Sequence, residues 1–318
     1  MFIINPYIYA DPAPAGVPFE MRFVTTVSST EVKMPIVTTD ASGVLVFDDG
    51  TSNVTGSANQ ATHTFASAGS YLVKYYGTAT ALEYSSSPSS NLTEIVSWGE
   101  TGATAACLKN MSSLTTVATN LESTITDLSY FWSNNSSSAS ITSLDVSNVT
   151  DMSRMFHNSY GFNQDIGSWD TGSVINASYM FSNTYSFVQD INGWDVSNVT
   201  DMTQMFIASA YNQDLNSWDT SSVVNFTNMF YNADDADIDM SSWDFSSGTS
   251  YTHMLDYSGI GTANYDKFLV RLNAQRITHS LTGRAIGNIP STYTTATGRA
   301  PRTTLIDNGW TLTDDGPV

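Results

Sequence analysis

The chain has 318 residues, with 11 Lys and Arg against 30 Asp and Glu, and its formal net charge at pH 7 is −19. We therefore exclude nucleic acid as an expected partner, because binding to phosphate requires clustered Lys and Arg. No stretch reaches the roughly 18 consecutive apolar residues of a membrane-spanning helix. The single cysteine, Cys107, excludes an intramolecular disulfide and a cysteine-based zinc site.

Residues 1–18 are predicted to form an apolar arm that is interrupted by prolines. A secretory signal needs a basic start and an unbroken apolar core, whereas the first basic residue here is Arg22, so we expect no Sec signal. The apolar side chains would be costly to leave in water, and we predict that the arm inserts into a neighbouring protein of an assembled particle. The alternative is that the arm adds a strand to the chain's own sandwich. The residues concerned are Phe2, Ile3, Ile4, Tyr7 and Ile8.

Residues 19–96 have the pattern of a small antiparallel β-sandwich. Short runs rich in β-branched and aromatic residues alternate with turn signals such as Asp48-Asp49-Gly50 and Ala68-Gly69. Such spacing is typical of two packed antiparallel sheets. The best strand candidates are 21–27, 33–38, 43–47, 61–65 and 70–78.

Residues 97–260 repeat with a period near 25 residues. The string LDVSNVTDMSRMF begins at Leu144 and WDVSNVTDMTQMF begins at Trp194, and weaker copies lie between and after them. Equivalent positions follow at steps of 25, 25, 24 and 25 residues, and a degraded copy over 125–132 brings the total to six units. Propeller blades repeat at about 40 to 45 residues, so the shorter period predicts a leucine-rich-repeat-like solenoid.

Each unit is too small to bury its own apolar residues. Val149, Met152, Met155 and Phe156 recur at spacings that predict one side of a short α- or 3₁₀-helical turn. The stretch that leads to Trp169 is extended in character. Stacking the units buries these side chains in one continuous column.

Residues 261–318 break the period and are predicted to cap the column. Asn264 can start a helix that runs through Leu272. Such a cap covers the last open coil, an edge that otherwise invites aggregation. Six of the eleven basic residues gather in the cap, where they either complement the acidic end of the column or dock on an acidic neighbour: Lys267, Arg271, Arg276, Arg284, Arg299 and Arg302.

Two sets of motifs resemble known families. The turn Val46-Phe47-Asp48-Asp49-Gly50, with the strands around His63 and Tyr71, resembles the polycystic-kidney-disease-like (PKD-like) β-sandwich, although Phe47 replaces that family's tryptophan. This module, the junction Ile95-Val96-Ser97-Trp98-Gly99 and the DVSNVTDMxxMF repeats, in this order, resemble the BspA-like leucine-rich-repeat surface proteins. The resemblance implies a mainly β fold with short helical turns: a PKD/Ig-like sandwich, a leucine-rich-repeat-like solenoid and a small cap. It also implies display on bacterial surfaces or bacteriophage particles, action through contact, and no known chemistry.

The candidate chemical residues have structural interpretations. Two ladders of aspartates recur with the repeat, and a Ser or Thr two residues later predicts Asx turns, in which the carboxylate accepts backbone N–H groups. Calcium is the alternative for Asp235, Asp237 and Asp239, a spacing that suits the cation but lacks the glycine and distal glutamate of an EF-hand. No other cofactor is expected. We find no phosphate loop, nucleophile elbow or metalloprotease helix in the sequence, so we expect no enzyme.

Tyrosines follow the Met-Phe turn in successive units at shifting offsets, where packing does not obviously require them. Exposed aromatic residues on a solenoid face can bind saccharide or protein. The alternative is that they pack at the turns. The candidate binding face is Tyr160, Tyr185, Tyr211, Tyr231 and Tyr257.

Of the two locations that the resemblance implies, the missing Sec signal and the apolar arm favour a non-enzymatic bacteriophage virion protein, such as a tail fibre, tail-tip or capsid-surface protein. Its acidic solenoid would serve host-surface recognition or particle stabilisation. The expected partners are other virion proteins through the arm, further copies of the chain within the particle, and a host protein or glycan. The alternative is a secreted bacterial cell-surface adhesin. A third option, an ice-binding array, requires regular outward Thr-x-Thr rows, which the sequence does not show.

Overall fold

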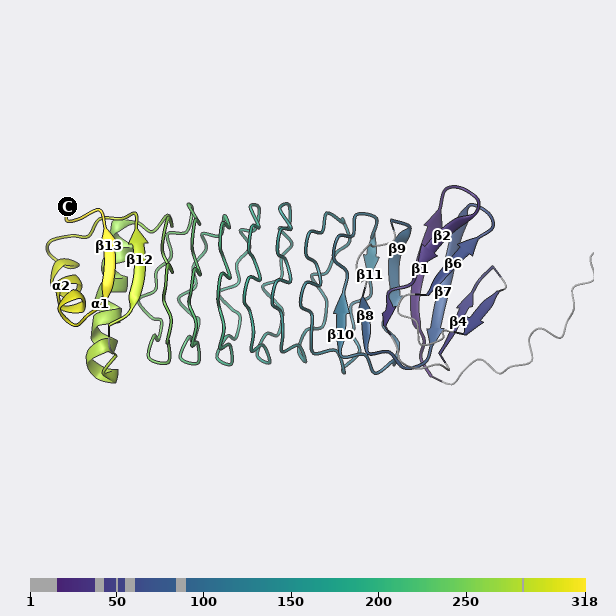
Figure 1. Ribbon diagram of the computed structural model, residues 1–318, viewed down its shortest axis with the longest axis horizontal. Helices are drawn as coiled ribbons and strands as arrows, with labels where there is room; N and C mark the ends of the chain where they lie inside the picture. Colours follow the sequence, from purple (N-terminus) through teal and green to yellow (C-terminus); the bar gives the residue numbers. More distant parts are fainter. Residues whose placement is uncertain (1–15, 38–42, 50, 55–60, 84–89, 282) are drawn as a thin grey trace, which may run out of the picture.

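In a computed structural model, the chain forms one long column with a β-sandwich at the N-terminal end and a helical cap at the C-terminal end (Figure 1). The structure describes residues 16–37, 43–49, 51–54, 61–83, 90–281 and 283–318. The mainly β fold class is confirmed, since only two helices accompany the strands in these ranges. The predicted arm residues lie outside the described residues: Phe2, Ile3, Ile4, Tyr7 and Ile8.

The sandwich is organised around a central strand, β1, which buries every second side chain. Its main sheet has the order β11-β9-β1-β7-β4-β5, and smaller sheets have the orders β10-β8-β3 and β2-β6. Each predicted strand overlaps an observed one. The strands are β1 (Phe19–Thr25), β2 (Thr30–Lys33), β3 (Ile36–Val37), β4 (Val44–Phe47), β5 (Ser52–Val54), β6 (Thr62–Phe65), β7 (Gly69–Tyr76), β8 (Ala81–Glu83), β9 (Leu92–Ser97), β10 (Ala105–Cys107) and β11 (Thr116–Val117).

The column begins inside the sandwich. Strand β9 pairs antiparallel with β1 on one side and parallel with β11 on the other, and β8 pairs antiparallel with β3 and parallel with β10. Pairing therefore crosses the predicted boundary between residues 96 and 97 without a linker. Because the first coil pairs with β8 and β9, the edges of these two strands that face the repeats are covered.

The coils stack in parallel at the period seen in the sequence. One isolated parallel bridge joins each coil to the next, in the series Ala105, Asp127, Asp151, Asn176, Asp201, Asn225 and Ser250.

The predicted helical turn is instead a run of reverse turns, and that local prediction is wrong. Met155 N–H donates to Met152 O at 3.1 Å and Ser159 N–H to Phe156 O at 3.0 Å. The third residue of each turn, Arg154 or Asn158, has a φ of 57°, which is the position where a type II turn requires a positive φ. The alternate N–H groups of Met152, Arg154, Phe156 and Asn158 donate to carbonyls of the next coil, so they are not available for i→i−4 helical bonds.

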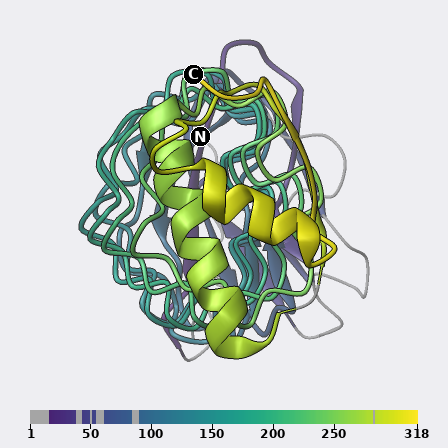
Figure 2. The same cartoon turned by 90° about the vertical axis from the view of Figure 1, so that its left-hand side faces the viewer.

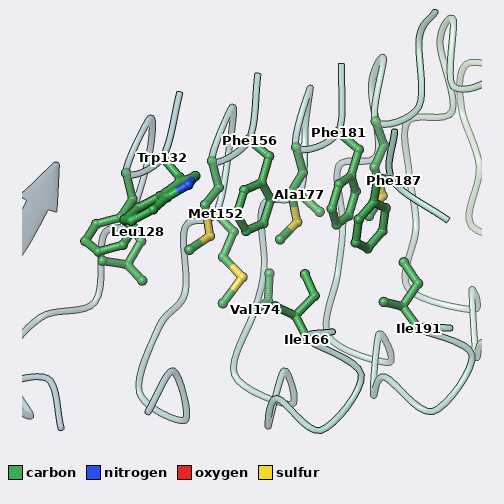
Figure 3. Packing of buried hydrophobic residues seen from close by; sticks show 14 of the residues in the cluster. Leu128, Trp132, Met152, Phe156, Ile166, Val174, Ala177, Phe181, Phe187 and Ile191 are labelled. Carbon is green, nitrogen blue, oxygen red and sulfur yellow. The ribbon is translucent and has the colours of Figure 1, made fainter. Parts of the chain in front are cut away.

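The interior of the column is a set of aromatic ladders (Figure 3). Ring centroids lie 5.4 Å apart between Phe156 and Phe181, and 5.5 Å apart between Phe181 and Phe206 and between Phe206 and Phe230. A second ladder consists of tryptophans whose indole N–H groups donate to carbonyls of the preceding coil at 3.0–3.2 Å; its members are Trp169, Trp194, Trp218 and Trp243. Each rung thus buries apolar surface and pairs its polar atom.

The cap closes the last coil, as predicted, but its first helix begins earlier and ends later than expected. It contains α1 (Thr262–His279), β12 (Ala285–Ile289), α2 (Arg299–Asp307) and β13 (Thr311–Asp314). Viewed along the column, α1 lies across the open end of the last coil, and α2 crosses α1 (Figure 2). Met254 N–H donates to Ile286 O at 3.1 Å, which joins β12 to the last coil. Neither helix is long and apolar enough to cross a membrane, over the ranges that the structure describes.

Candidate binding surface

Two ladders of aspartates on the outside of the coils are held by local turns. Each carboxylate accepts the backbone N–H of the residue two positions later, at 2.7–3.2 Å. The Asx-turn interpretation is therefore confirmed. Hydrogen bonds from the Ser197 hydroxyl and N–H hold the pKa of Asp195 below its usual value. The ladders are Asp145, Asp170, Asp195, Asp219 and Asp244, and Asp165, Asp190, Asp214 and Asp239.

A third ladder of the same kind lies at the bridge positions, and sequence reasoning missed it. Its members accept the N–H two residues later at 2.7–3.1 Å, and they are Asp127, Asp151, Asn176, Asp201 and Asn225. Amides interrupt the carboxylates, and the Asn176 amide donates to Asp151 Oδ2 at 3.3 Å. This separation reduces repulsion between like charges in stacked coils. The sequence signal was the Asp or Asn that opens each Met-Phe turn.

An asparagine ladder occupies the left-handed third position of the second reverse turn. Asn134, Asn158, Asn183 and Asn232 have φ values between 51° and 57°. Asparagine is among the few residues that adopt this conformation readily. Asn183 Nδ2 also donates to Asn158 Oδ1 at 2.7 Å, so neighbouring rungs are joined by side chains.

The five candidate tyrosines do not form one face. Tyr211 is fully buried, and its ring stacks on Phe187 at 5.9 Å, so the assignment of Tyr211 to a binding face is wrong. The 24-residue step shortens this turn by one residue and places Tyr211 where the preceding coils carry Phe162 and Phe187. Tyr231 is half-buried and meets the exposed Tyr257 edge-on at 5.6 Å.

Tyr160 and Tyr185 do form an exposed pair. Their side chains are 55% and 56% exposed, and their rings are parallel within 6° with centroids 5.4 Å apart. They occupy the same position in successive coils, four residues after Phe156 and Phe181. Of the predicted binding face, this is the pair in which both rings are exposed.

A row of alternating cations and aromatic rings is a further surface feature that the sequence did not reveal. The Arg154 guanidinium lies 4.2 Å from the centre of the Tyr179 ring and 5.4 Å from that of Tyr130, and Lys109 lies 5.7 Å from Tyr130 on its other side. Cation–π attraction of this kind contributes about 0.5–1 kcal/mol per exposed contact. The row ties four successive coils together.

The calcium candidates are not assembled into a ligand set. Asp237 Oδ1 accepts the Gly261 N–H at 2.7 Å and the Asn264 amide at 2.9 Å, while Asp239 Oδ2 accepts a hydrogen bond from Lys267 at 2.6 Å. Asp235 is exposed. Within the described ranges no group of three His, Cys, Asp or Glu side chains could hold a metal. Asp237 and Asp239 therefore fasten α1 to the last coil.

The basic residues of the cap divide between side-chain partners and backbone carbonyls of the last coil. Lys267 pairs with Asp239 of the column, which agrees with the first of the two roles considered for these residues. Arg271 Nε instead donates to Trp243 O at 2.7 Å, and Arg302 pairs with Asp314 inside the cap at 2.7 Å. Gln275 donates to Trp243 O at 3.1 Å and accepts the Phe245 N–H at 2.8 Å. Its side-chain amide thus supplies hydrogen bonds that a further coil would otherwise make to this end of the column.

The repeats match a known family model. The model described as "Mycoplasma protein of unknown function, DUF285" matches residues 105–210 and 186–268, which together span just over half of the chain. The chain belongs to this family. DUF285 is a family of BspA-like surface proteins, in agreement with the resemblance carried by the DVSNVTDMxxMF repeats. The match begins after the sandwich, so the PKD-like assignment of residues 19–96 stays a prediction. No curated protein and no solved structure matches the chain.

Proposed function

We propose that the protein is a non-enzymatic display protein of a bacteriophage virion, where its acidic solenoid recognises a host surface or stabilises the particle. The observation that carries this proposal is the continuity of the column, from the sandwich strands β8 and β9 to the cap strand β12. With no linker in between, the outer coils are held at a fixed distance from the sandwich. The aspartates of the two outer ladders are engaged in local turns, which supports action through contact.

A bacterial cell-surface adhesin is the second candidate, and the family match favours it. DUF285 is described from Mycoplasma and belongs with BspA-like surface proteins. The physical role is the same in both cases, because a rigid column presents its side to another surface. What differs is the structure that anchors it.

The predicted arm allows a direct test of the virion proposal. Sedimentation velocity is measured for the full chain, for a chain that lacks residues 1–15, and for a chain of full length in which Phe2, Ile3 and Ile4 are replaced by serine. The deletion stops before Val17, because Val17 O accepts the Glu100 N–H at 2.9 Å and belongs to the column. Self-association of the full chain alone, with unchanged circular dichroism in all three, supports assembly through the arm.

A monomer in all three cases contradicts assembly through the arm. The adhesin is then tested by binding the fluorescently labelled chain to bacterial cells. Antibodies raised against residues 97–260 separate the two candidate locations independently, since they decorate either phage particles or bacterial cells under the electron microscope.

A further inference from the structure

The tyrosine pair stands between two coils that lack the ring. In the coil before Tyr160 the equivalent position is Ser136, and in the coil after Tyr185 it is Ala210. Because Tyr160 and Tyr185 are stacked on each other, one face of each ring contacts the other ring. The outer face of Tyr160 is thus left beside a serine and that of Tyr185 beside an alanine.

Each small residue opens a groove next to a ring. The groove beside Tyr160 has a volume of about 320 Å³, and its lining includes Asn134, Ser136, Asn158 and Asn163. The groove beside Tyr185 has a volume of about 260 Å³, and its lining includes Ala210, Asn232, Asp234 and Asp235. A groove therefore lies beside an exposed aromatic ring on both sides of the pair, but the groove beside Tyr185 also carries the carboxylates of Asp234 and Asp235.

The groove beside Tyr160 is lined by uncharged residues and holds unused hydrogen-bonding groups. Asn163 Oδ1 accepts the Val188 N–H and the Gln189 amide, but the Asn163 amide nitrogen donates to nothing in the described part of the chain. Asn158 Oδ1 accepts from Asn183, and the Asn158 amide nitrogen likewise has no acceptor among the described residues. Two N–H₂ groups beside one exposed ring face are suited to hydroxyl-rich ligands.

We propose that the Tyr160–Tyr185 pair and the groove beside Tyr160 bind a neutral oligosaccharide. This inference deepens the proposed display function and rests on it. A sugar ring can place its C–H face on the tyrosine and its hydroxyl rim on the amides. A nucleic-acid base also stacks on aromatic rings, but the chain carries a net charge of −19, which repels phosphate and anionic glycans alike.

The test is calorimetric titration of the full chain with maltohexaose, cellohexaose, xylohexaose and chitohexaose, and with a heparin hexasaccharide as the anionic probe. Three variants are compared: Tyr160→Ala removes the ring, Asn163→Asp keeps the acceptor and removes the donor, and Tyr257→Ala is the matched control. Tyr257 is 52% exposed, as the pair is, but it is not among the residues that line either groove. Circular dichroism and melting temperature show that each variant is folded.

We expect at least one neutral hexasaccharide to bind and the heparin fragment not to bind. Tyr160→Ala and Asn163→Asp each weaken binding about tenfold or more, whereas Tyr257→Ala leaves it unchanged. The inference is overturned if none of the four neutral sugars binds, if only heparin or a protein ligand binds, or if Tyr160→Ala retains full affinity. The arm deletion and the antibody labelling report on the display function separately, so a chain that is displayed but binds no neutral sugar loses this inference alone.

Discussion

Replacing Ala208 with asparagine should stabilise the column. Ala208 occupies the left-handed position with a φ of 49°, where four other coils carry asparagine: Asn134, Asn158, Asn183 and Asn232. The left-handed conformation costs an ordinary L-residue about 1–2 kcal/mol, and asparagine less. In Ala208→Asn the new amide lies between Asn183 and Asn232, where it can extend the hydrogen bond that already joins Asn183 to Asn158 at 2.7 Å.

The expected gain in the free energy of unfolding is about 1–1.5 kcal/mol. Roughly 1 kcal/mol comes from relief of the backbone conformation and up to about 0.5 kcal/mol from a half-exposed hydrogen bond. Ala208→Gly relieves the backbone without adding an amide, so its gain should be smaller. Urea unfolding followed by tryptophan fluorescence measures each gain as a shift of the midpoint at constant slope.

Ala210→Asn is the matched control, because Ala210 is also half-buried and lies only two residues further along the chain, but lacks a positive φ. We expect no gain from it. If Ala208→Asn is neutral or destabilising, or if Ala210→Asn stabilises equally, the left-handed conformation is not what selects asparagine in this ladder.

Three further predictions concern the cap and the core. Gln275→Leu leaves the Phe245 N–H of the last coil unpaired, while Trp243 O keeps its hydrogen bond from Arg271, and should lower the free energy of unfolding by about 1–3 kcal/mol in urea denaturation; a loss below about 0.5 kcal/mol would show that water replaces the amide. Burial by itself raises the pKa of Asp239, but hydrogen bonds from Lys267 and Ser241 lower it to about 2. The stabilisation from this pair is therefore complete above about pH 4 and is lost as the pH falls toward 2, and screening limits it to about 1 kcal/mol; Asp239→Asn should abolish this part of the acid dependence, and an unchanged profile would contradict the assignment. Tyr211→Phe removes a buried hydroxyl that faces the Ile191 backbone N–H without forming a hydrogen bond of ordinary geometry, so stability should change by no more than about 1 kcal/mol; a larger loss in thermal unfolding would mean that the hydroxyl is firmly paired.

The features that the sequence predicted well depend on residues within a single repeat and recur in the next repeat. The period, the aspartate turns and the capping helix each follow from local spacing or from a side chain that bonds its own backbone two residues later. Asp145 and Asp170 illustrate this, since each carboxylate needs nothing beyond its own turn.

The features that failed depend on where neighbouring coils sit. An i, i+3 spacing of buried residues is common to a helix and to successive reverse turns, and the N–H of Arg154 chooses between them by donating to Ser178 O of the next coil. Tyr211 looked like Tyr160 because both follow a Met-Phe turn, yet a single missing residue moves Tyr211 into the core. The residue pattern within one repeat does not show how the coil that it forms is aligned with the neighbouring coil.

Because no linker separates the sandwich from the coils, the number of repeats sets the distance between the sandwich and the cap. Every unit of about 25 residues adds one rung, and a rung advances the column by roughly 4.8 Å, the spacing of paired strands. Inserting or deleting whole units would change the reach of the protein in fixed steps while both end structures stay as they are. Length in such a chain is therefore a quantity that duplication of a short stretch of gene can adjust directly, without any redesign of the sandwich or the cap.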